Sequence, residues 1–150
     1  MQPQIRINKR FVVRTAVVYF PPHNGSDVLA RIAGALANGL ERAGHQVTVI
    51  RADKGSPQPL TSFGYIAIGA ESRSFFSREP DGDIKAYLSN AGMVSGKRSF
   101  AFVRPRGLFA LKTLGNLMRR MEAEGMFIRY SEILPNEAAA AATAARLKVE

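Results

Sequence analysis

The sequence contains no cysteine and only two histidines. Disulfide bonds, thiolate metal sites and cysteine nucleophiles are therefore excluded, and two distant histidines without a carboxylate cluster argue against a metal site. No apolar run approaches the length needed to span a bilayer. The first ten residues, MQPQIRINKR, lack the apolar core of a secretory signal. We therefore expect a cytoplasmic protein without a membrane span.

Acidic residues are also scarce. The sequence has 12 Asp and Glu but 21 Lys and Arg, which gives a formal net charge of +9. A surplus of this sign favours an anionic partner, which means a phosphorylated ligand, an acidic protein, nucleic acid or a membrane surface. The alternative is a basic surface that only keeps the protein in solution. Net charge alone leaves both interpretations open.

What the 150 residues do contain is an alternation of apolar strands and amphipathic helices. Apolar runs predict strands at 16–20, 46–51, 63–70, 99–103 and 126–128, the last with room to extend through Tyr130. Apolar residues at helical spacing predict helices near 27–43, 84–91, 111–121 and 136–145. Such an order indicates a parallel sheet covered on both faces. We predict an α/β three-layer sandwich at residues 14–150, preceded by a basic arm at residues 1–13.

The stretch at residues 14–27, RTAVVYFPPHNGSD, reads as a strand, a tight loop and the start of a helix. This arrangement is a simple anion-binding device, because a helix N-terminus presents free backbone N–H groups. His23, Ser26 and Asp27 lie in this one loop, where neighbours in sequence rarely adopt the geometry of a hydrolytic triad. We therefore interpret the loop as a candidate anion site.

The order and spacing of several weak motifs resemble the flavodoxin-like family. The phosphate loop of that family has the form Ser/Thr-x-Thr-Gly-x-Thr, and PPHNGS at residues 21–26 occupies its place at the same length, with Ala30 in the helix that follows. The likeness covers residues 14–148 and continues at 65–69, Pro80, 84–88 and 96–97. It implies a five-stranded parallel sheet in the order 2-1-3-4-5. It also implies FMN as the cofactor of electron transfer or another flavin-linked redox reaction.

The loop also departs from the family pattern. Only Ser26 keeps a hydroxyl at a matched position, and the two prolines that open the loop remove two backbone donors. Asn24-Gly25 can nevertheless adopt left-handed conformations that aim consecutive N–H groups at an anion, and His23 can donate a hydrogen bond to a phosphate. The resemblance places the FMN phosphate at His23, Asn24, Gly25 and Ser26.

Two further loops, at residues 70–78 and 104–108, are expected beside this one. Ligands of open parallel sheets bind beyond the carboxyl ends of the strands, where the strand order reverses. In the family these loops flank the isoalloxazine ring, and Phe75 and Phe76 are better placed than Phe109 to stack on it. The alternative is that Phe75 and Phe76 pack on the sheet edge or on a neighbouring chain. The residues that the resemblance assigns to the flavin here are Glu71, Ser72, Arg73, Phe75, Phe76, Arg104, Arg106 and Gly107.

Four arginines fall on these two loops, namely Arg73, Arg78, Arg104 and Arg106. If they surround one crevice, they favour a polyanionic ligand or an acidic protein surface; otherwise each is solvated separately. The first hypothesis is an FMN-binding redox protein that meets an acidic redox partner or an anionic small molecule. The second is a flavodoxin-like module that has lost FMN and binds an acidic protein or another polyanion. Nucleic-acid binding would rest on net charge alone, and we do not expect it.

Overall fold

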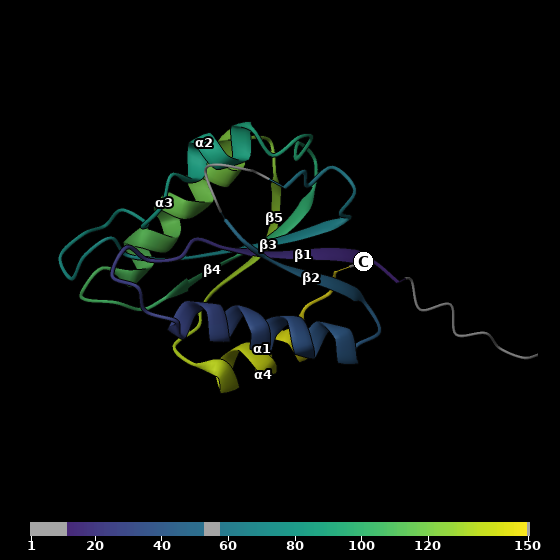
Figure 1. Ribbon diagram of the computed structural model, residues 1–150, viewed down its shortest axis with the longest axis horizontal. Coiled ribbons are helices and arrows are strands. Elements are labelled where there is room, and N and C mark those ends of the chain that lie inside the picture. Colours follow the sequence, from purple (N-terminus) through teal and green to yellow (C-terminus); the bar gives the residue numbers. More distant parts are fainter. Residues whose placement is uncertain (1–11, 53–57, 150) are drawn as a thin grey trace, which may run out of the picture.

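The computed structural model describes residues 12–52 and 58–149. The predicted basic arm at residues 1–13 lies almost entirely outside these described residues. Within them, helices and strands alternate in the order that the sequence predicts (Figure 1). The elements are β1 (Arg14–Tyr19), α1 (Val28–Arg42), β2 (Gln46–Arg51), β3 (Tyr65–Glu71), α2 (Ile84–Ser89), β4 (Arg98–Arg104), α3 (Ala110–Ala123), β5 (Phe127–Ile133) and α4 (Glu137–Arg146).

The strands form one parallel sheet in the order β2-β1-β3-β4-β5. Helices α1 and α4 cover one face of the sheet, and α2 and α3 cover the other (Figure 1). Parallel neighbours need crossover connections, and the helices between the strands supply most of them. The predicted fold class, an α/β three-layer sandwich with strand order 2-1-3-4-5, is confirmed.

The sheet separates two hydrophobic cores, because successive side chains of a strand point to opposite faces. In β1, Val17 lies in the core beneath α1 and α4, whereas Ala16 and Val18 lie in the core beneath α2 and α3. The central strands β1, β3 and β4 are buried on both faces along most of their length. This double burial explains why their sequences are almost continuously apolar.

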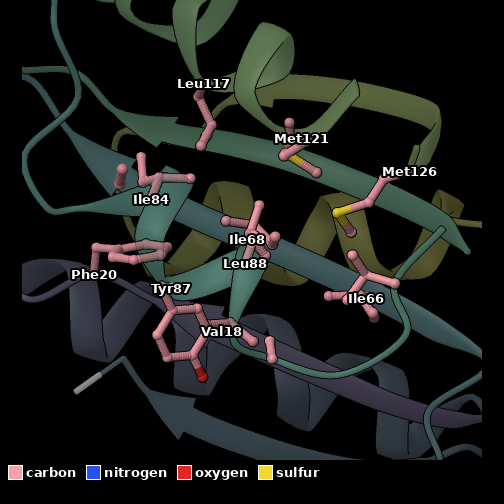
Figure 2. Close-up of a cluster of buried hydrophobic side chains, with 14 of the residues drawn as sticks. Val18, Phe20, Ile66, Ile68, Ile84, Tyr87, Leu88, Leu117, Met121 and Met126 are labelled. Atoms are coloured by element: carbon pink, nitrogen blue, oxygen red, sulfur yellow. The ribbon is translucent and has the colours of Figure 1, made fainter. Parts of the chain in front are cut away.

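Figure 2 shows the core on the side of α2 and α3. Ile68 of β3, Leu88 of α2 and Met121 of α3 meet there, each no more than 1% exposed. Tyr87 lies edge-on against Phe20, with ring centroids 5.4 Å apart. Burial of each of these large side chains contributes about 1.5–3 kcal/mol, so this core holds α2 and α3 firmly against the ends of the strands.

The fifth strand is longer than predicted. The apolar pattern indicated a strand at 126–128 that could reach Tyr130, but pairing with β4 continues to Ile133. Ser131 and Glu132 interrupt the apolar pattern without interrupting the ladder, because backbone pairing does not require apolar side chains. They are tolerated because β5 is an edge strand whose residues are exposed or only partly buried. The other strand ends lie within two residues of their predicted positions.

Two helix ends follow their sequence signals. Asn136 caps α4, because its Oδ1 accepts a hydrogen bond from the N–H of Ala139 at 2.8 Å. Gly44 follows the end of α1 with a φ of +99°, a conformation that favours glycine. Asp27 occupies the N-cap position of α1 but makes no side-chain capping bond; its carboxylate instead lies 3.3 Å from the Arg31 guanidinium.

Candidate functional site

The loops after β1, β3 and β4 meet at one edge of the sheet, on the left in Figure 1, which we call the carboxyl edge. The strands are parallel, so all three loops leave the sheet in the same direction. The connections from β1 and β3 lead to opposite faces here, which is where open α/β sheets place their ligands. The candidate residues named from the sequence therefore lie on a shared edge of the molecule.

Two backbone N–H groups of the β1–α1 loop are bonded within the loop itself. Gly25 donates to the carbonyl of Pro22 at 3.1 Å, and Ser26 donates to Oδ1 of Asn24 at 2.9 Å. Gly25 has a left-handed φ of +77°, but these internal acceptors already occupy the N–H groups that an anion would need. The Ser26 hydroxyl in turn accepts from the N–H of Val28 at 3.4 Å.

His23 is bonded twice to Asp81, a residue that the sequence analysis did not single out. The His23 backbone N–H donates to Oδ2 of Asp81 at 2.9 Å, and the ring Nδ1 lies 2.6 Å from the same oxygen. Because a carboxylate only accepts, Nδ1 carries a proton and Nε2 is left for another partner. The His23 side chain is 62% exposed, whereas that of Asp81 is 11% exposed. The two residues are 58 positions apart, so no local pattern signals this pair.

These bonds decide how well an FMN phosphate fits the loop. The two prolines carry no N–H, and the N–H groups of His23, Gly25 and Ser26 all donate to protein acceptors. A phosphate in the loop would have to displace these acceptors. The loop therefore does not fit the FMN phosphate in the arrangement that the family resemblance implies.

The loops after β3 and β4 touch where the resemblance places the isoalloxazine ring. The N–H of Leu108 donates to the carbonyl of Phe75 at 3.1 Å. Gly107 has a φ of +74°, and a Cβ added to it would lie 1.9 Å from the same carbonyl oxygen. The backbones of the two loops are therefore in direct contact, and no planar ring fits between them at this point.

Glu71 and Arg104 form an ion pair across the paired ends of β3 and β4. Arg104 Nη1 lies 2.6 Å from Oε1 of Glu71, and the two residues are partners in the ladder. The Glu71 side chain is fully buried and that of Arg104 is 27% exposed. A buried carboxylate requires a counter-ion, so the charge of Arg104 is used within the fold. Arg104 is therefore not a free charge, so the alternative in which four free guanidinium groups surround one crevice does not hold for this residue.

Two other predicted site residues also have structural partners. Ser72 is fully buried, and its hydroxyl lies 2.6 Å from the hydroxyl of Thr113 on α3. Arg78 places its guanidinium 4.4 Å from the centre of the Phe109 ring, a cation–π contact that leaves the charge near the surface. Arg106 Nη1 lies 3.5 Å from the carbonyl of Arg73, so these two arginines lie side by side on adjoining loops.

Phe75 and Phe76 are exposed rather than packed on the sheet edge. They are 53% and 72% exposed, and their rings meet edge to face with centroids 5.0 Å apart. On the adjoining loop and the first turn of α3, Leu108 and Leu111 are 64% and 75% exposed. We call these four apolar side chains, together with Arg73, Arg78 and Arg106, the docking surface.

A polar cavity of about 570 Å³ lies beside the β1–α1 loop. It is lined by two residues of that loop, by the first turn of α2 and the three residues before it, by Arg73 after β3 and by Arg120 on α3. The charged and titratable members of its lining are His23, Arg73, Asp81, Asp83, Lys85 and Arg120. Among the predicted site residues, the structure thus brings His23 and Arg73 together at this cavity.

Tyr87 lines a neighbouring cavity of about 420 Å³ together with Phe20 and Arg51. Burial raises the pKa of the Tyr87 phenol above its ordinary value. Its hydroxyl is buried and finds no hydrogen-bond partner within the described part of the chain. Figure 2 shows this ring at the margin of the core.

Two features are absent from residues 12–52 and 58–149. No three His, Asp or Glu side chains gather there in a way that could hold a metal ion. No helix in these ranges is both long enough and apolar enough to cross a bilayer.

Comparison with known proteins identifies the fold. No family model matches the sequence, and no curated protein matches it either. A solved flavodoxin from the domain Archaea matches 89% of this chain and 92% of its own, at 19% identity and a TM-score of 0.64. Flavodoxin 2 from Bacillus cereus matches 87% of this chain and 94% of its own, at 11% identity and a TM-score of 0.68.

An enzyme is also among the similar structures. NAD(P)H:quinone oxidoreductase from Methanothermobacter marburgensis matches 90% of this chain and 96% of its own, at 12% identity and a TM-score of 0.57. Identities this low carry information about the backbone and not about ligands or reactions. Because the strand order, the layers and the near-complete coverage all agree, the chain has a flavodoxin-like fold.

Proposed function

We propose that this chain is a flavodoxin-like binding module that recognises an acidic protein through the docking surface at the carboxyl edge. One observation carries the proposal: Phe75 and Phe76 stand in solvent on a loop whose arginines form no ion pair among the described residues, while the N–H groups of His23, Gly25 and Ser26 are bonded within the protein. FMN-dependent electron transfer is the second candidate.

The apolar half of the docking surface has the composition of a protein-binding anchor. Clustered exposed apolar side chains are uncommon on soluble proteins and mark interaction sites. Aromatic anchors in the centre of an interface often supply most of the binding energy. The hydrogen bond from Leu108 to Phe75 and the close approach of Gly107 hold the two loops together. The anchors are therefore presented on a fixed backbone, which limits the entropy lost on binding.

The charged half of the docking surface favours a partner of negative charge. Arg73, Arg78 and Arg106 lie on the same two loops as Phe75, Phe76 and Leu108, and the chain as a whole carries a net charge of +9. An acidic rim on the partner would complement this arrangement and accelerate association. Single-stranded nucleic acid is disfavoured, because bases stack on aromatic faces along a basic groove, whereas these two rings are turned edge to face against each other.

Site-specific photocrosslinking in the cells that produce the protein tests the proposal. A benzophenone amino acid replaces Phe76 or Leu111 in the docking surface, and Phe127 provides the matched control. Phe127 is an exposed phenylalanine, at 57%, with Arg129 5.6 Å from its ring, but it begins β5 at the opposite edge of the sheet. We expect one acidic protein to be captured from positions 76 and 111 and not from position 127.

The captured protein is then purified and its affinity for this chain is measured at two salt concentrations. Arg106→Glu is expected to weaken binding and to reduce its dependence on salt. Capture of a basic protein, of nucleic acid or lipid, of a second copy of this chain, or of nothing specific to positions 76 and 111, would overturn the proposal.

Electron transfer with FMN is favoured by two observations, the flavodoxin-like fold and the left-handed conformation of Gly25. Visible absorption of the purified protein and a titration of FMN fluorescence distinguish the candidates. We expect a colourless protein that leaves flavin fluorescence unchanged up to high micromolar FMN. Quenching that is weakened by Ser26→Ala and kept by Lys112→Ala would instead place the FMN phosphate in the β1–α1 loop and put this candidate first.

A further inference from the structure

We infer that the polar cavity beside His23 binds a small phosphate monoester. The cavity is lined by His23, Arg73, Lys85 and Arg120, together with the carboxylates of Asp81 and Asp83. Gly25 and Ser26, the residues of the predicted phosphate loop, do not line it; they face a separate cavity of about 260 Å³. The cavity shares Arg73 with the docking surface but none of its apolar side chains, and the inference assigns the anion to side chains rather than to the N–H groups of the loop.

The imidazole of His23 is oriented for a ligand by Asp81. One carboxylate oxygen holds both the backbone N–H of His23, at 2.9 Å, and the ring Nδ1, at 2.6 Å. Two bonds from one residue to one oxygen limit rotation of the ring, and they leave Nε2 as the group that can meet a ligand. Nε2 accepts a hydrogen bond from a P–OH group when the ring is neutral. It donates one to a P–O⁻ oxygen when the ring is protonated, so either form of a phosphate monoester has a partner.

The cationic side chains of the cavity differ in their availability. Arg120 is partly engaged, because it pairs with Glu79 and donates to the carbonyl of Asn116. Among the described residues, the ammonium of Lys85 and the guanidinium of Arg73 make no hydrogen bond or ion pair. Two such cations on one cavity wall supply the charge-assisted hydrogen bonds that phosphate oxygens accept most strongly.

The volume and the lining of the polar cavity limit the size and polarity of its ligand. A cavity of about 570 Å³ lies within the range of small-molecule sites. Three cationic side chains line the cavity against the carboxylates of Asp81 and Asp83, although Arg120 also pairs with Glu79, and Asp81 already accepts from His23. This balance admits one phosphate group but not a string of them, and the polar lining suits a small polar molecule. A phosphate monoester of a small polar alcohol meets these requirements.

Glycerol 3-phosphate is a direct probe, with inorganic phosphate and glycerol as its two halves. The titration is followed by NMR at constant ionic strength, through the His23 ring nitrogens and the Lys85 amide. We expect glycerol 3-phosphate to shift both sets of signals, inorganic phosphate to do so more weakly, and glycerol not at all. No shift of the His23 signals at millimolar glycerol 3-phosphate would overturn the inference, and so would equal shifts with glycerol.

Single variants then locate the bound phosphate. Lys85→Met is expected to weaken glycerol 3-phosphate about tenfold, the effect of losing one charge-assisted hydrogen bond, and His23→Gln is expected to weaken it as well. Both side chains are exposed, so the fold should be kept, which circular dichroism verifies. Lys112→Met removes an exposed lysine outside the cavity lining and should change nothing. Equal losses in all three variants would indicate a non-specific charge effect and overturn the assignment.

Asp81→Asn tests the positioning role of the carboxylate. We expect the ring nitrogen shifts of His23 to report a changed tautomer balance, and glycerol 3-phosphate to bind more weakly, with the fold preserved. Unchanged nitrogen shifts would show that Asp81 does not orient the ring. Crosslinking from position 76 should not respond to Lys85→Met, so the phosphate inference and the docking proposal can fail separately.

Discussion

The ion pair between Glu71 and Arg104 gives a direct test of whether Arg104 serves the fold or a ligand. Arg104→Met keeps most of the apolar stem of the side chain and removes the guanidinium. The buried carboxylate of Glu71 then loses its partner at 2.6 Å, and its other oxygen already has no hydrogen-bond partner among the described residues. The substitution therefore leaves an uncompensated charge at the end of β3.

The expected loss of stability is about 3 kcal/mol. Breaking a buried ion pair from one side typically costs about 3–5 kcal/mol, and the lower value applies here because Arg104 is 27% exposed and its site is reached by water. Replacing both partners with apolar side chains is often neutral. The double variant Glu71→Met/Arg104→Met should therefore recover most of the stability that Arg104→Met loses.

Urea unfolding of the wild type, both single variants and the double variant completes a double-mutant cycle. Circular dichroism follows the transition, and linear extrapolation gives the free energy of unfolding in water. Equal slopes against urea would show that the denatured states are comparable. With a total stability of about 5–15 kcal/mol for a domain of this kind, a loss of about 3 kcal/mol is readily measured.

The reasoning is refuted if Arg104→Met loses less than about 1 kcal/mol, a value typical of a surface ion pair. It is also refuted if the double variant is as unstable as Arg104→Met alone. Either result would mean that Arg104 does not compensate Glu71 and is available to a ligand, as the sequence suggested.

Burial raises the pKa of Tyr65 to about 12, so between pH 10 and 12 the folded state keeps a proton that the unfolded state releases. The free energy of unfolding should therefore fall by about 2–3 kcal/mol over that window on account of Tyr65. In urea titrations Tyr65→Phe should remove this part of the loss and leave the part due to Tyr87, whose pKa burial also raises. Gly107→Ala should destabilise the protein by more than Gly25→Ala, although both glycines have positive φ, because only the first Cβ would collide with the Phe75 carbonyl; equal changes in melting temperature would contradict this. Asn136→Ala should remove about 1 kcal/mol through loss of the α4 cap, and Asn136→Asp should restore most of it.

Much of the fold was predictable, because the signals that specify it are local. The apolar run in β1 and the helical spacing in α1 and α3 each lie within one segment, and they predicted those elements within two or three residues. The end of β5 was not predictable in this way. Ser131 and Glu132 have no strand pattern of their own, and they join the sheet because β4 offers them backbone partners.

The candidate site was predictable in its location and not in its chemistry. Parallel strands place their following loops at the same edge, so Phe75, Arg106 and Gly107 were expected near the β1–α1 loop, and they lie on the same edge of the sheet. Asp81 carried no signal that would connect it with His23. The position of Glu71 at the end of an apolar strand was only a weak indication that this carboxylate needs a partner. The strand register identified that partner as Arg104.

The sequence by itself determined which segments become strands and helices, and therefore which loops gather at the carboxyl edge, because hydrophobic periodicity acts between near neighbours. Only the tertiary structure decided which polar groups on that edge remain available. The bond from His23 to Asp81 joins residues 58 positions apart, and the bond from Arg104 to Glu71 joins residues 33 positions apart. Burial and hydrogen bonding change the chemistry of a side chain only once its partners are beside it. Three N–H groups of the loop that reads as an anion site in the sequence are therefore bonded within the protein, and its histidine faces a different cavity.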